Sequence, residues 1–477
     1  MKRATFINSN LALLLLAAAS GCGGGDNGTT DNVNAIQVGG LTDETTTSLD
    51  YMKAMSLAVS QMNGALAQAG SNVRFNANIV DSRSDAALSK TLAADLITNK
   101  KVKALVTDVS ADTISVNQLN YGDAAIAAGS PKVPITCYAC SSSAINKVTQ
   151  TEMDPIKQAA ERDEENWLFR EFFDGKYEAN AAVQIMLNEA TGATGDVNGD
   201  GNFKVVVYAT DDAFGTSSTN GIKAAMDNLV AGPHSVEVIT VNSKADPTTY
   251  DWTNDFAKIM DDRNDTTATQ DGNPDAVFLA VLSLLATGTV KAYHQANYTT
   301  RMYTATAFRR DYILRSIPGA AEGVEGDSPR AWANDESGTA FQNTFKAQNG
   351  TDPEMLAAGA YDSMMTLLLA TLQATVDLAN PTEVDPGAIR DQLLLIQEPN
   401  GQVIRPTAEG LALAVTTIKA HMPINYVTAS GTPKWDSVGN AFPQLIHWKV
   451  ENDKFVEHEA YSCADNTTGV ATCSLTP

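Results

Sequence analysis

Cysteine and histidine are scarce in this chain: its 477 residues include five of each. Five cysteines are too few for a fold held together mainly by disulfides. The histidines are scattered, and none stands in a recognisable catalytic pattern with a nucleophile or an acid. The GxSxG nucleophile elbow, the Walker phosphate loop and the HExxH zinc motif are all missing. These absences argue against an enzyme.

Basic residues are few as well, with 33 Lys and Arg against 56 Asp and Glu and a formal net charge of -23. This excess of acid excludes a protein that binds nucleic acid non-specifically, because such a protein needs a basic face. The 43% of hydrophobic and 19% of charged residues are typical of a globular protein. The length suits two or three domains.

Long hydrophobic runs are missing except at the N-terminus. There, Lys2 and Arg3 precede the apolar run 11–19, which is too short to span a bilayer but suits the core of a signal peptide. The run ends in the letters ASGC, which resemble a bacterial lipobox. We therefore expect residues 1–21 to be a lipoprotein signal peptide and Cys22 to carry the lipid. Ordinary secretory cleavage is the alternative.

Lipidation would anchor the mature protein to a bacterial membrane, in the periplasm or on the cell surface, and to the outer membrane in a Gram-negative cell. Residues 22–35, rich in Gly, Asn, Asp and Thr, are expected to be a flexible tether. Because conditions outside the cytoplasm are oxidising, cysteines of an exported protein can form disulfides.

Strand and helix patterns alternate from Ile36 onward. In the first half, strands are predicted at 36–40, 73–81 and 102–106, and a helix with an apolar face precedes Asn63-Gly64, which predicts its end. The pattern resumes with apolar strands at 203–208 and 276–281. This order predicts an α/β protein with two doubly wound lobes built on parallel central sheets.

Several segments together resemble one family, the type I periplasmic substrate-binding proteins, in the branch that binds branched-chain amino acids. In chain order they are IQVGGLTD, LAVSQMNG, IVDSRSD, VKALVTDVSADT, VPITCYACSSSAI, WLFREFF, VVVYATDDAFG, PDAVFLAV, AEGVEGDSP, AAGAYDSMMTLLLATLQA and PKWDSVGNAF. Each motif is weak alone, whereas their order and spacing along nearly the whole chain are specific.

The resemblance implies a clamp whose chain crosses three times between two lobes, forming a three-strand hinge. Lobe I would comprise 36–168 plus 328–438, and lobe II 169–327 plus 439–477. A small molecule would bind between the lobes, where open parallel sheets place their ligands. The resemblance also implies a monomer that presents this ligand to an ABC permease and catalyses no reaction.

Seven lobe I residues are implied as ligand contacts: Thr42, Ser110, Ala111, Tyr138, Ala139, Cys140 and Ser141. Ser110 matches the family serine that binds a ligand carboxylate. Residues 139–141 match its donors of N–H and hydroxyl groups, and Tyr138 replaces a usual proline. From the residues alone, Ser110 and Asp112 equally suit a helix cap, and 137–143 a polar turn.

Six lobe II residues are implied as ligand contacts: Asp211, Phe214, Leu282, Ser283, Thr306 and Phe308. Amino-acid binders of the family have a glutamate at the position of Thr306, where it pairs with the ligand ammonium. Without that carboxylate a buried ammonium is costly, so a standard α-amino acid is not expected unless another acid from a different loop, such as Asp43 or Asp211, replaces it. Two arginines, Arg309 and Arg310, follow in the sequence. They either bind an anionic ligand or are solvated side chains on the surface of the lobe.

The pair Cys137 and Cys140 forms a CxxC motif within the predicted ligand loop. A structural disulfide suits an exported protein, and free thiols or a redox or metal site are the alternatives. A zinc site needs four ligands, and no further His or Cys lies near in the sequence. Cys463 and Cys473 are expected to form a second disulfide.

One loop resembles the start of a calcium site. Asp196, Asn198 and Asp200 supply oxygens at EF-hand positions 1, 3 and 5, but position 12 is Val207, inside a strand. A polar hairpin is the alternative. The charged residues 150–166 are expected to form a solvated helix. The leading hypothesis is thus a lipid-anchored solute-binding protein of an ABC importer; a ligand-sensing receptor without a transporter and a calcium-dependent surface lipoprotein are the alternatives.

Overall fold

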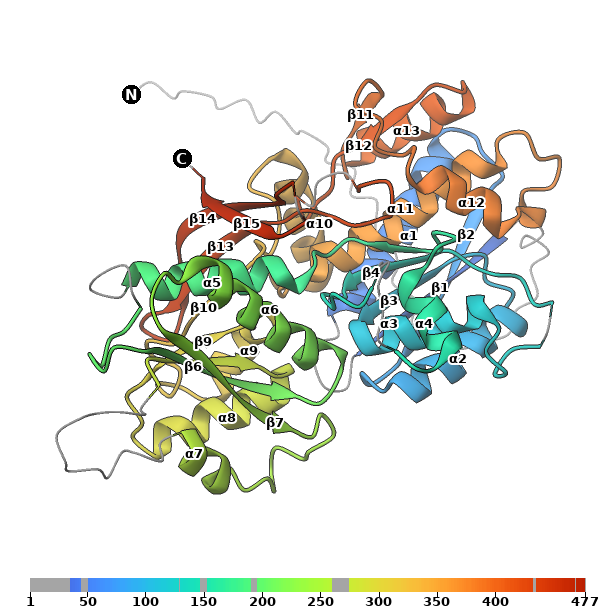
Figure 1. The fold of residues 1–477 in the computed structure, drawn as a ribbon. Helices are drawn as coiled ribbons and strands as arrows, with labels where there is room; N and C mark the ends of the chain where they lie inside the picture. The colour runs from blue at the N-terminus through green and yellow to red at the C-terminus, as the bar shows by residue number, and fades with distance from the viewer. Residues whose placement is uncertain are drawn as a thin grey trace, which may run out of the picture. The chain divides into compact units, whose positions relative to one another are not determined.

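Two large β-sheets organise the residues that the structure describes (Figure 1). The computed structural model describes residues 35–43, 50–127, 129–145, 152–189, 195–259, 274–431, 435–467 and 469–476. All of them belong to one unit, residues 34–477. The predicted signal peptide, Cys22 and nearly all of the tether lie outside the described residues.

The first sheet is five-stranded and wholly parallel, in the order β2-β1-β3-β4-β5. Its strands are β1 (Ala35–Thr42), β2 (Arg74–Asp81), β3 (Leu105–Val109), β4 (Ile135–Ala139) and β5 (Leu168–Arg170). The strand order reverses between β1 and β3, and such a switch point opens a crevice at the carboxyl ends of the strands. Ligand-binding residues are therefore expected directly after β1 and β3.

Helices cover this sheet. They are α1 (Asp50–Gln68), α2 (Ala86–Thr98), α3 (Ser110–Asn117), η1 (Gln118–Tyr121), α4 (Pro155–Arg162), α11 (Ala357–Thr375), η3 (Pro381–Glu383), α12 (Pro386–Leu393) and α13 (Ala408–Lys419). Helix α1 packs against α11 and α13, and α2 against α3. A small parallel pair, β11 (Gln402–Ile404) and β12 (Ile424–Tyr426), lies beside α13.

Three expectations for this region need correction. Helix α1 does not end at Asn63-Gly64 but continues to Gln68. The Asn63 side chain does not cap the helix, because it donates to the carbonyl of Phe75 in β2 and accepts from the N–H of the same residue. The strand predicted at 102–106 lies at Leu105–Val109 as β3, so that Ser110 follows it directly as the first residue of α3. Helix α4 of the segment 150–166 is only partly solvated, since it packs against α3 and η1.

The second sheet is eight-stranded, in the order β15-β14-β13-β10-β9-β8-β6-β7. Its strands are β6 (Phe203–Thr210), β7 (His234–Val241), β8 (Ala276–Ala280), β9 (Arg301–Thr304), β10 (Glu325–Ser328), β13 (Gln444–Val450), β14 (Phe455–Asp465) and β15 (Ala471–Leu475). Strands β6 to β10 are parallel and repeat the order of the first sheet. Their switch point lies between β6 and β8.

Helices cover both faces of this parallel part. They are α5 (Gly175–Glu189), α6 (Ala213–Leu229), α7 (Thr253–Ile259), α8 (Ser283–Gln295), η2 (Thr306–Phe308) and α9 (Asp311–Ser316). Helix α10 (Glu336–Asn349) instead packs against α11, where the rings of Phe341 and Tyr361 lie 5.1 Å apart. Alternate residues of β6 enter different cores: Val205 and Val207 join one hydrophobic cluster, Val206 and Tyr208 another. Burial on both faces is typical of a central parallel strand, as its apolar run predicted.

The predicted fold class, α/β with two doubly wound parallel-type sheets, is confirmed. An antiparallel extension, β13 to β15, was not predicted. In it Cys463 stands directly opposite Cys473 and forms the expected disulfide.

The chain passes between the two sheets in three segments, after β5, β10 and β12. The first and third lie side by side: Arg170 donates through Nε and Nη2 to Asn440 Oδ1 at 2.8 and 2.5 Å. Trp435 Nε1 donates to the Arg170 carbonyl at 2.7 Å. A hydrogen-bonded bundle of crossing segments thus connects the sheets, whereas the lobe boundaries stay a prediction.

Candidate ligand-binding site

A cavity of about 280 Å³ lies where the carboxyl ends of the parallel strands of both sheets meet. The five-stranded sheet contributes residues after β1, β2, β3, β4 and β5. The eight-stranded sheet contributes residues after β6, β7, β8 and β9. The cavity therefore lies at both switch points, where α/β sheets bind small molecules, and its volume approaches that of typical small-ligand pockets.

On the side of the first sheet, hydrogen bonds hold two of the residues predicted as ligand contacts, Ser110 and Tyr138, at the cavity. Ser110 is the first residue of α3, and its Oγ accepts a hydrogen bond from Ser142 N at 2.9 Å. The Tyr138 hydroxyl bonds Thr42 Oγ1 at 2.9 Å, and its ring packs against Tyr51 with centroids 5.3 Å apart. Ser110 and Tyr138 line the cavity, together with Ala139 and Ser141.

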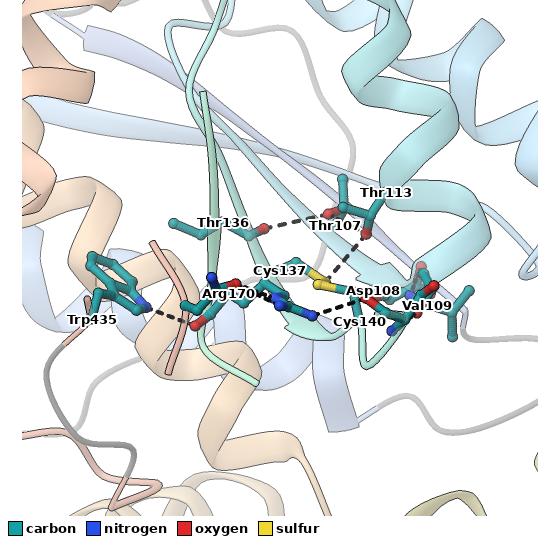
Figure 2. The surroundings of a disulfide bond; sticks show 12 residues. Thr107, Asp108, Val109, Thr113, Thr136, Cys137, Cys140, Arg170 and Trp435 are labelled. Carbon is teal, nitrogen blue, oxygen red and sulfur yellow. Dashed lines mark hydrogen bonds between the residues drawn. A yellow bond between two sulfur atoms is a disulfide. The ribbon is translucent and has the colours of Figure 1, made fainter. Parts of the chain in front are cut away.

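A disulfide joins Cys137 and Cys140, in keeping with the first of the three alternatives for this motif (Figure 2). Both cysteines are fully buried, and Thr113 Oγ1 donates to Cys137 Sγ at 3.2 Å. The two residues that the disulfide spans, Tyr138 and Ala139, both line the cavity. The cross-link therefore restrains the backbone at the edge of the cavity.

On the side of the second sheet, four of the residues predicted as ligand contacts line the cavity: Phe214, Leu282, Ser283 and Thr306. Leu282 follows β8, and Ser283 opens α8. The Ser283 hydroxyl donates to the Ala307 carbonyl at 2.8 Å, which ties this turn to the one after β9.

Five predicted residues do not line the cavity: Thr42, Ala111, Cys140, Asp211 and Phe308. Thr42 lies against the Tyr138 hydroxyl, and Asp211 accepts from Ser243 N at 2.8 Å. The turn η2 directs Phe308 into the core, where its ring stacks on Trp448. Sequence position alone could not distinguish such residues from neighbours that face the cavity.

Glu178 of α5 lines the cavity and was missed by the sequence analysis. Its Oε1 accepts hydrogen bonds from Thr306 N at 2.6 Å and from Thr306 Oγ1 at 2.5 Å. A carboxylate from a different segment therefore stands beside Thr306, as the alternative to the missing glutamate allowed, but it belongs to Glu178 and not to Asp43 or Asp211. Because Glu178 and Thr306 are 128 positions apart, no local pattern in the sequence indicates that they are in contact.

Burial governs the charge of Glu178. The side chain is only 2% exposed, and desolvation raises its pKa to about 7, against the opposing effect of the Thr306 hydrogen bonds. Burial, and next the charge of Glu178, raise the pKa of Asp327 well above its usual range. Near neutral pH this pair therefore holds at least one proton.

A second acidic pair lies on the side of the first sheet. Asp108 lines the cavity, and the neighbouring Asp112 in α3 is completely buried. Burial, followed by the nearby Asp112, raises the pKa of Asp108 well above its usual range, and burial raises that of Asp112 to about 6. Asp43, which lines the same region, accepts from Ser84 Oγ at 2.6 Å.

In the loop that resembles a calcium site, the side-chain oxygens of Asp196 and Asn198 accept hydrogen bonds from backbone N–H groups of the same loop. Asp196 accepts from Gly199 N and Gly201 N at 2.7 and 2.8 Å, and Asn198 Oδ1 accepts from Asp200 N. Within the described part of the chain, no group of three or more His, Cys, Asp or Glu side chains is arranged to hold a metal ion. The same part holds no helix whose length and apolar character would suffice to cross a membrane.

Solved structures of similar fold cover most of this chain. A leucine-binding protein from Thermotoga maritima matches with 15% identity and a TM-score of 0.62, over 89% of this chain and 98% of that one. A solute-binding protein of an ABC transporter from R. palustris, in complex with benzoate, matches with 16% identity and a TM-score of 0.61, over 89% and 95%.

A branched-chain amino-acid substrate-binding protein from Streptococcus pneumoniae, in complex with isoleucine, matches with 16% identity and a TM-score of 0.58, over 89% of this chain and 100% of that one. At these identities the likeness establishes the fold. No curated protein sequence matches the chain. The model of the family described as periplasmic binding protein matches residues 35–394. The chain therefore belongs to the periplasmic binding protein family.

Proposed function

We propose that this protein is a lipid-anchored extracytoplasmic receptor that captures a small amino-acid-like molecule between two lobes and presents it to an ABC permease. One observation carries the proposal: a single cavity at both switch points is lined by polar groups from both sheets, among them Ser110 and Glu178. A molecule held there would contact both lobes at once, which favours a closed clamp.

The lining suits an amphipathic ligand. Phe172, Phe214, Leu282 and Leu285 offer apolar surface, and each Å² that they remove from water contributes about 25 cal/mol. Ser110 and Ser141 offer hydroxyl groups to an acid group. The Glu178 carboxylate offers a partner to an ammonium, which removes the main objection to an amino acid. Leucine, isoleucine and benzoate, named for the similar structures, are therefore the first ligands to test.

A thermal-shift screen of the full-length lipoprotein in detergent, against a metabolite library, tests this function. We expect one ligand class to raise the melting temperature, since a ligand at a hundredfold excess over its Kd stabilises the folded state by about 2.7 kcal/mol. Calorimetry then measures the affinity. A library in which no compound stabilises the protein would contradict solute capture.

The lipid anchor is tested separately. We expect mass spectrometry of the membrane fraction to show an acylated Cys22 as the mature N-terminus. A Cys22→Ala variant should leave the membrane fraction, and a variant that stays equally membrane-bound contradicts the anchor. Copurification of a permease with the ligand-loaded wild-type protein, but not with the ligand-free protein, would support the transport role over that of a receptor without a transporter.

A further inference from the structure

Two adjacent arginines, Arg309 and Arg310, differ sharply in their surroundings. Arg309 Nη2 binds Glu457 Oε1 at 2.7 Å, and its Nη1 donates to Ser328 Oγ at 2.9 Å. Its charge is therefore neutralised by a carboxylate, and the residue holds β10 and β14 together. Arg309 has a structural partner for each end of its guanidinium group.

Arg310 has no such partner. Its side chain is 5% exposed, and Nη1 donates to the carbonyls of Thr306 and Arg309, at 3.1 and 3.0 Å. The guanidinium charge also acts on the Tyr51 hydroxyl and on the Glu354 carboxylate. Nε is buried without a hydrogen bond. Among the described residues, no carboxylate oxygen lies within the 4.0 Å of an ion pair with Arg310. The side chain nevertheless lines the ligand cavity.

The other cations that line the cavity are paired. Lys244 Nζ lies 3.1 Å from Asp85 Oδ2, and Arg83 Nε lies 3.9 Å from Asp81 Oδ2. Among the described residues Arg310 is thus a cavity-lining cation without an ion-pair contact, and Glu354 is a carboxylate on which its charge acts from a longer distance. A buried guanidinium without an ion-pair contact is costly unless an anion meets it.

The position of Arg310 relative to Glu178 narrows the chemistry further. Thr306 joins them: its N–H and hydroxyl bind Glu178, and its carbonyl accepts from Arg310. A cation and a carboxyl group that both line the cavity are therefore each hydrogen-bonded to the same residue, Thr306. A planar guanidinium matches a carboxylate with two parallel hydrogen bonds.

We propose that Arg310 is the residue that binds the anionic group of the ligand, and that this group is a carboxylate on a small molecule with an apolar body. The ligand acid group is thereby recognised by a cation from the second sheet, in addition to hydroxyl and N–H groups from the first. This inference rests on the proposed solute-binding function and names the ligand class for the same cavity.

Stability of the ligand-free protein provides the first test. We expect Arg310→Gln to melt at the wild-type temperature or above it, because a buried charge without an ion-pair contact is removed. The matched control Arg309→Gln should melt several degrees lower, because the buried ion pair with Glu457 and the hydrogen bond to Ser328 are lost, although Glu457 keeps its contact with Arg330. An Arg310→Gln variant that loses as much stability as Arg309→Gln overturns the inference, since Arg310 would then have a structural role.

Binding of matched acids and amides provides the second test. The probes are acetate, isovalerate, benzoate and 3-phenylpropanoate, each paired with its amide, in thermal-shift and calorimetric titrations. We expect at least one acid, and not its amide, to stabilise the wild-type protein. Its Kd should rise at least tenfold in Arg310→Gln and less in Arg310→Lys. Equal effects of acid and amide, no effect of any acid, or unchanged acid binding by Arg310→Gln overturn the inference.

The ligand found in the metabolite screen separates this inference from the proposed function. If no library compound stabilises the wild-type protein, solute capture itself fails. If a ligand binds but carries no acid group, or binds Arg310→Gln as tightly as wild type, only the role of Arg310 fails.

Discussion

Glu178 and Thr306 are 128 positions apart in the sequence, yet the Glu178 carboxylate accepts both the backbone N–H and the hydroxyl of Thr306 at the wall of the ligand cavity. This contact joins the first turn of α5 to the turn that follows β9. It supplies a carboxylate where the sequence shows only a threonine. The ionisation of that carboxylate leads to the first two predictions.

Stability of the ligand-free protein should fall as the pH rises from about 4.5 to 7, in part because of Glu178. Its pKa is raised from 4.5 to about 7, so in this range the folded state keeps a proton that the unfolded state has lost. The folded state binds more protons, and the free energy of unfolding therefore decreases with rising pH. The Glu178 contribution is at most about 3 kcal/mol.

Denaturant unfolding of wild type and Glu178→Gln at several pH values measures this contribution. The variant should show a shallower loss of stability between pH 4.5 and 7, since other buried acids such as Asp112 keep their own contribution. Parallel pH profiles for the two proteins would contradict the raised pKa of Glu178.

Ligand binding should release a proton if the ligand presents an ammonium to Glu178. The positive charge favours the ionised carboxylate and lowers its pKa in the complex. Calorimetry at pH 6.5 in two buffers of different ionisation enthalpy measures the proton count, which Glu178→Gln should abolish while weakening binding by at least tenfold. The conservative variant Glu178→Asp serves as control, because it keeps the charge. Identical proton release by wild type and Glu178→Gln would exclude this role.

The crossing segments should depend on Asn440. Its Oδ1 accepts two hydrogen bonds from the buried Arg170 guanidinium, and Arg170 otherwise has the carbonyl of Ser142 and a longer contact with Asp174. We expect Asn440→Ala to reduce the free energy of unfolding by about 2–3 kcal/mol, because hydrogen bonds to a buried charge are lost.

Urea unfolding measures this loss. Asn228→Ala is the matched control, since the exposed Asn228 side chain bonds only the carbonyl of its own helix residue Ala224. Similar stabilities of the two variants would mean that Asn440 does not hold the first and third crossing segments together.

The disulfide Cys463–Cys473 should stabilise the antiparallel extension of the second sheet. It closes a loop with a sequence separation of 10, for which loop-closure entropy predicts about 2–3 kcal/mol. The double variant Cys463→Ala/Cys473→Ala should therefore melt lower than wild type under non-reducing conditions. Under a reductant strong enough to open this disulfide, the difference should disappear. A difference that persists unchanged there would assign the loss to side-chain packing.

The amino-acid sequence by itself determined the alternation of strands and helices, because a buried parallel strand needs an apolar run and an amphipathic helix an apolar face. Its resemblance to the family also indicated Ser110, Tyr138, Phe214 and Leu282 as ligand contacts; these residues line the cavity, since the ends of parallel strands meet at one edge of a sheet, while contact with a ligand stays a prediction. Local periodicity carries that information.

The tertiary structure alone decided which side chains line the cavity and which charged side chains form ion pairs. It brought Glu178 to Thr306, turned Phe308 into the core beside Trp448, and paired Arg309 with Glu457 while leaving Arg310 at the cavity wall. A local sequence pattern does not distinguish two adjacent residues of the same type, such as Arg309 and Arg310. Their roles separate only when packing fixes side-chain direction, and when distant residues supply or withhold a partner charge.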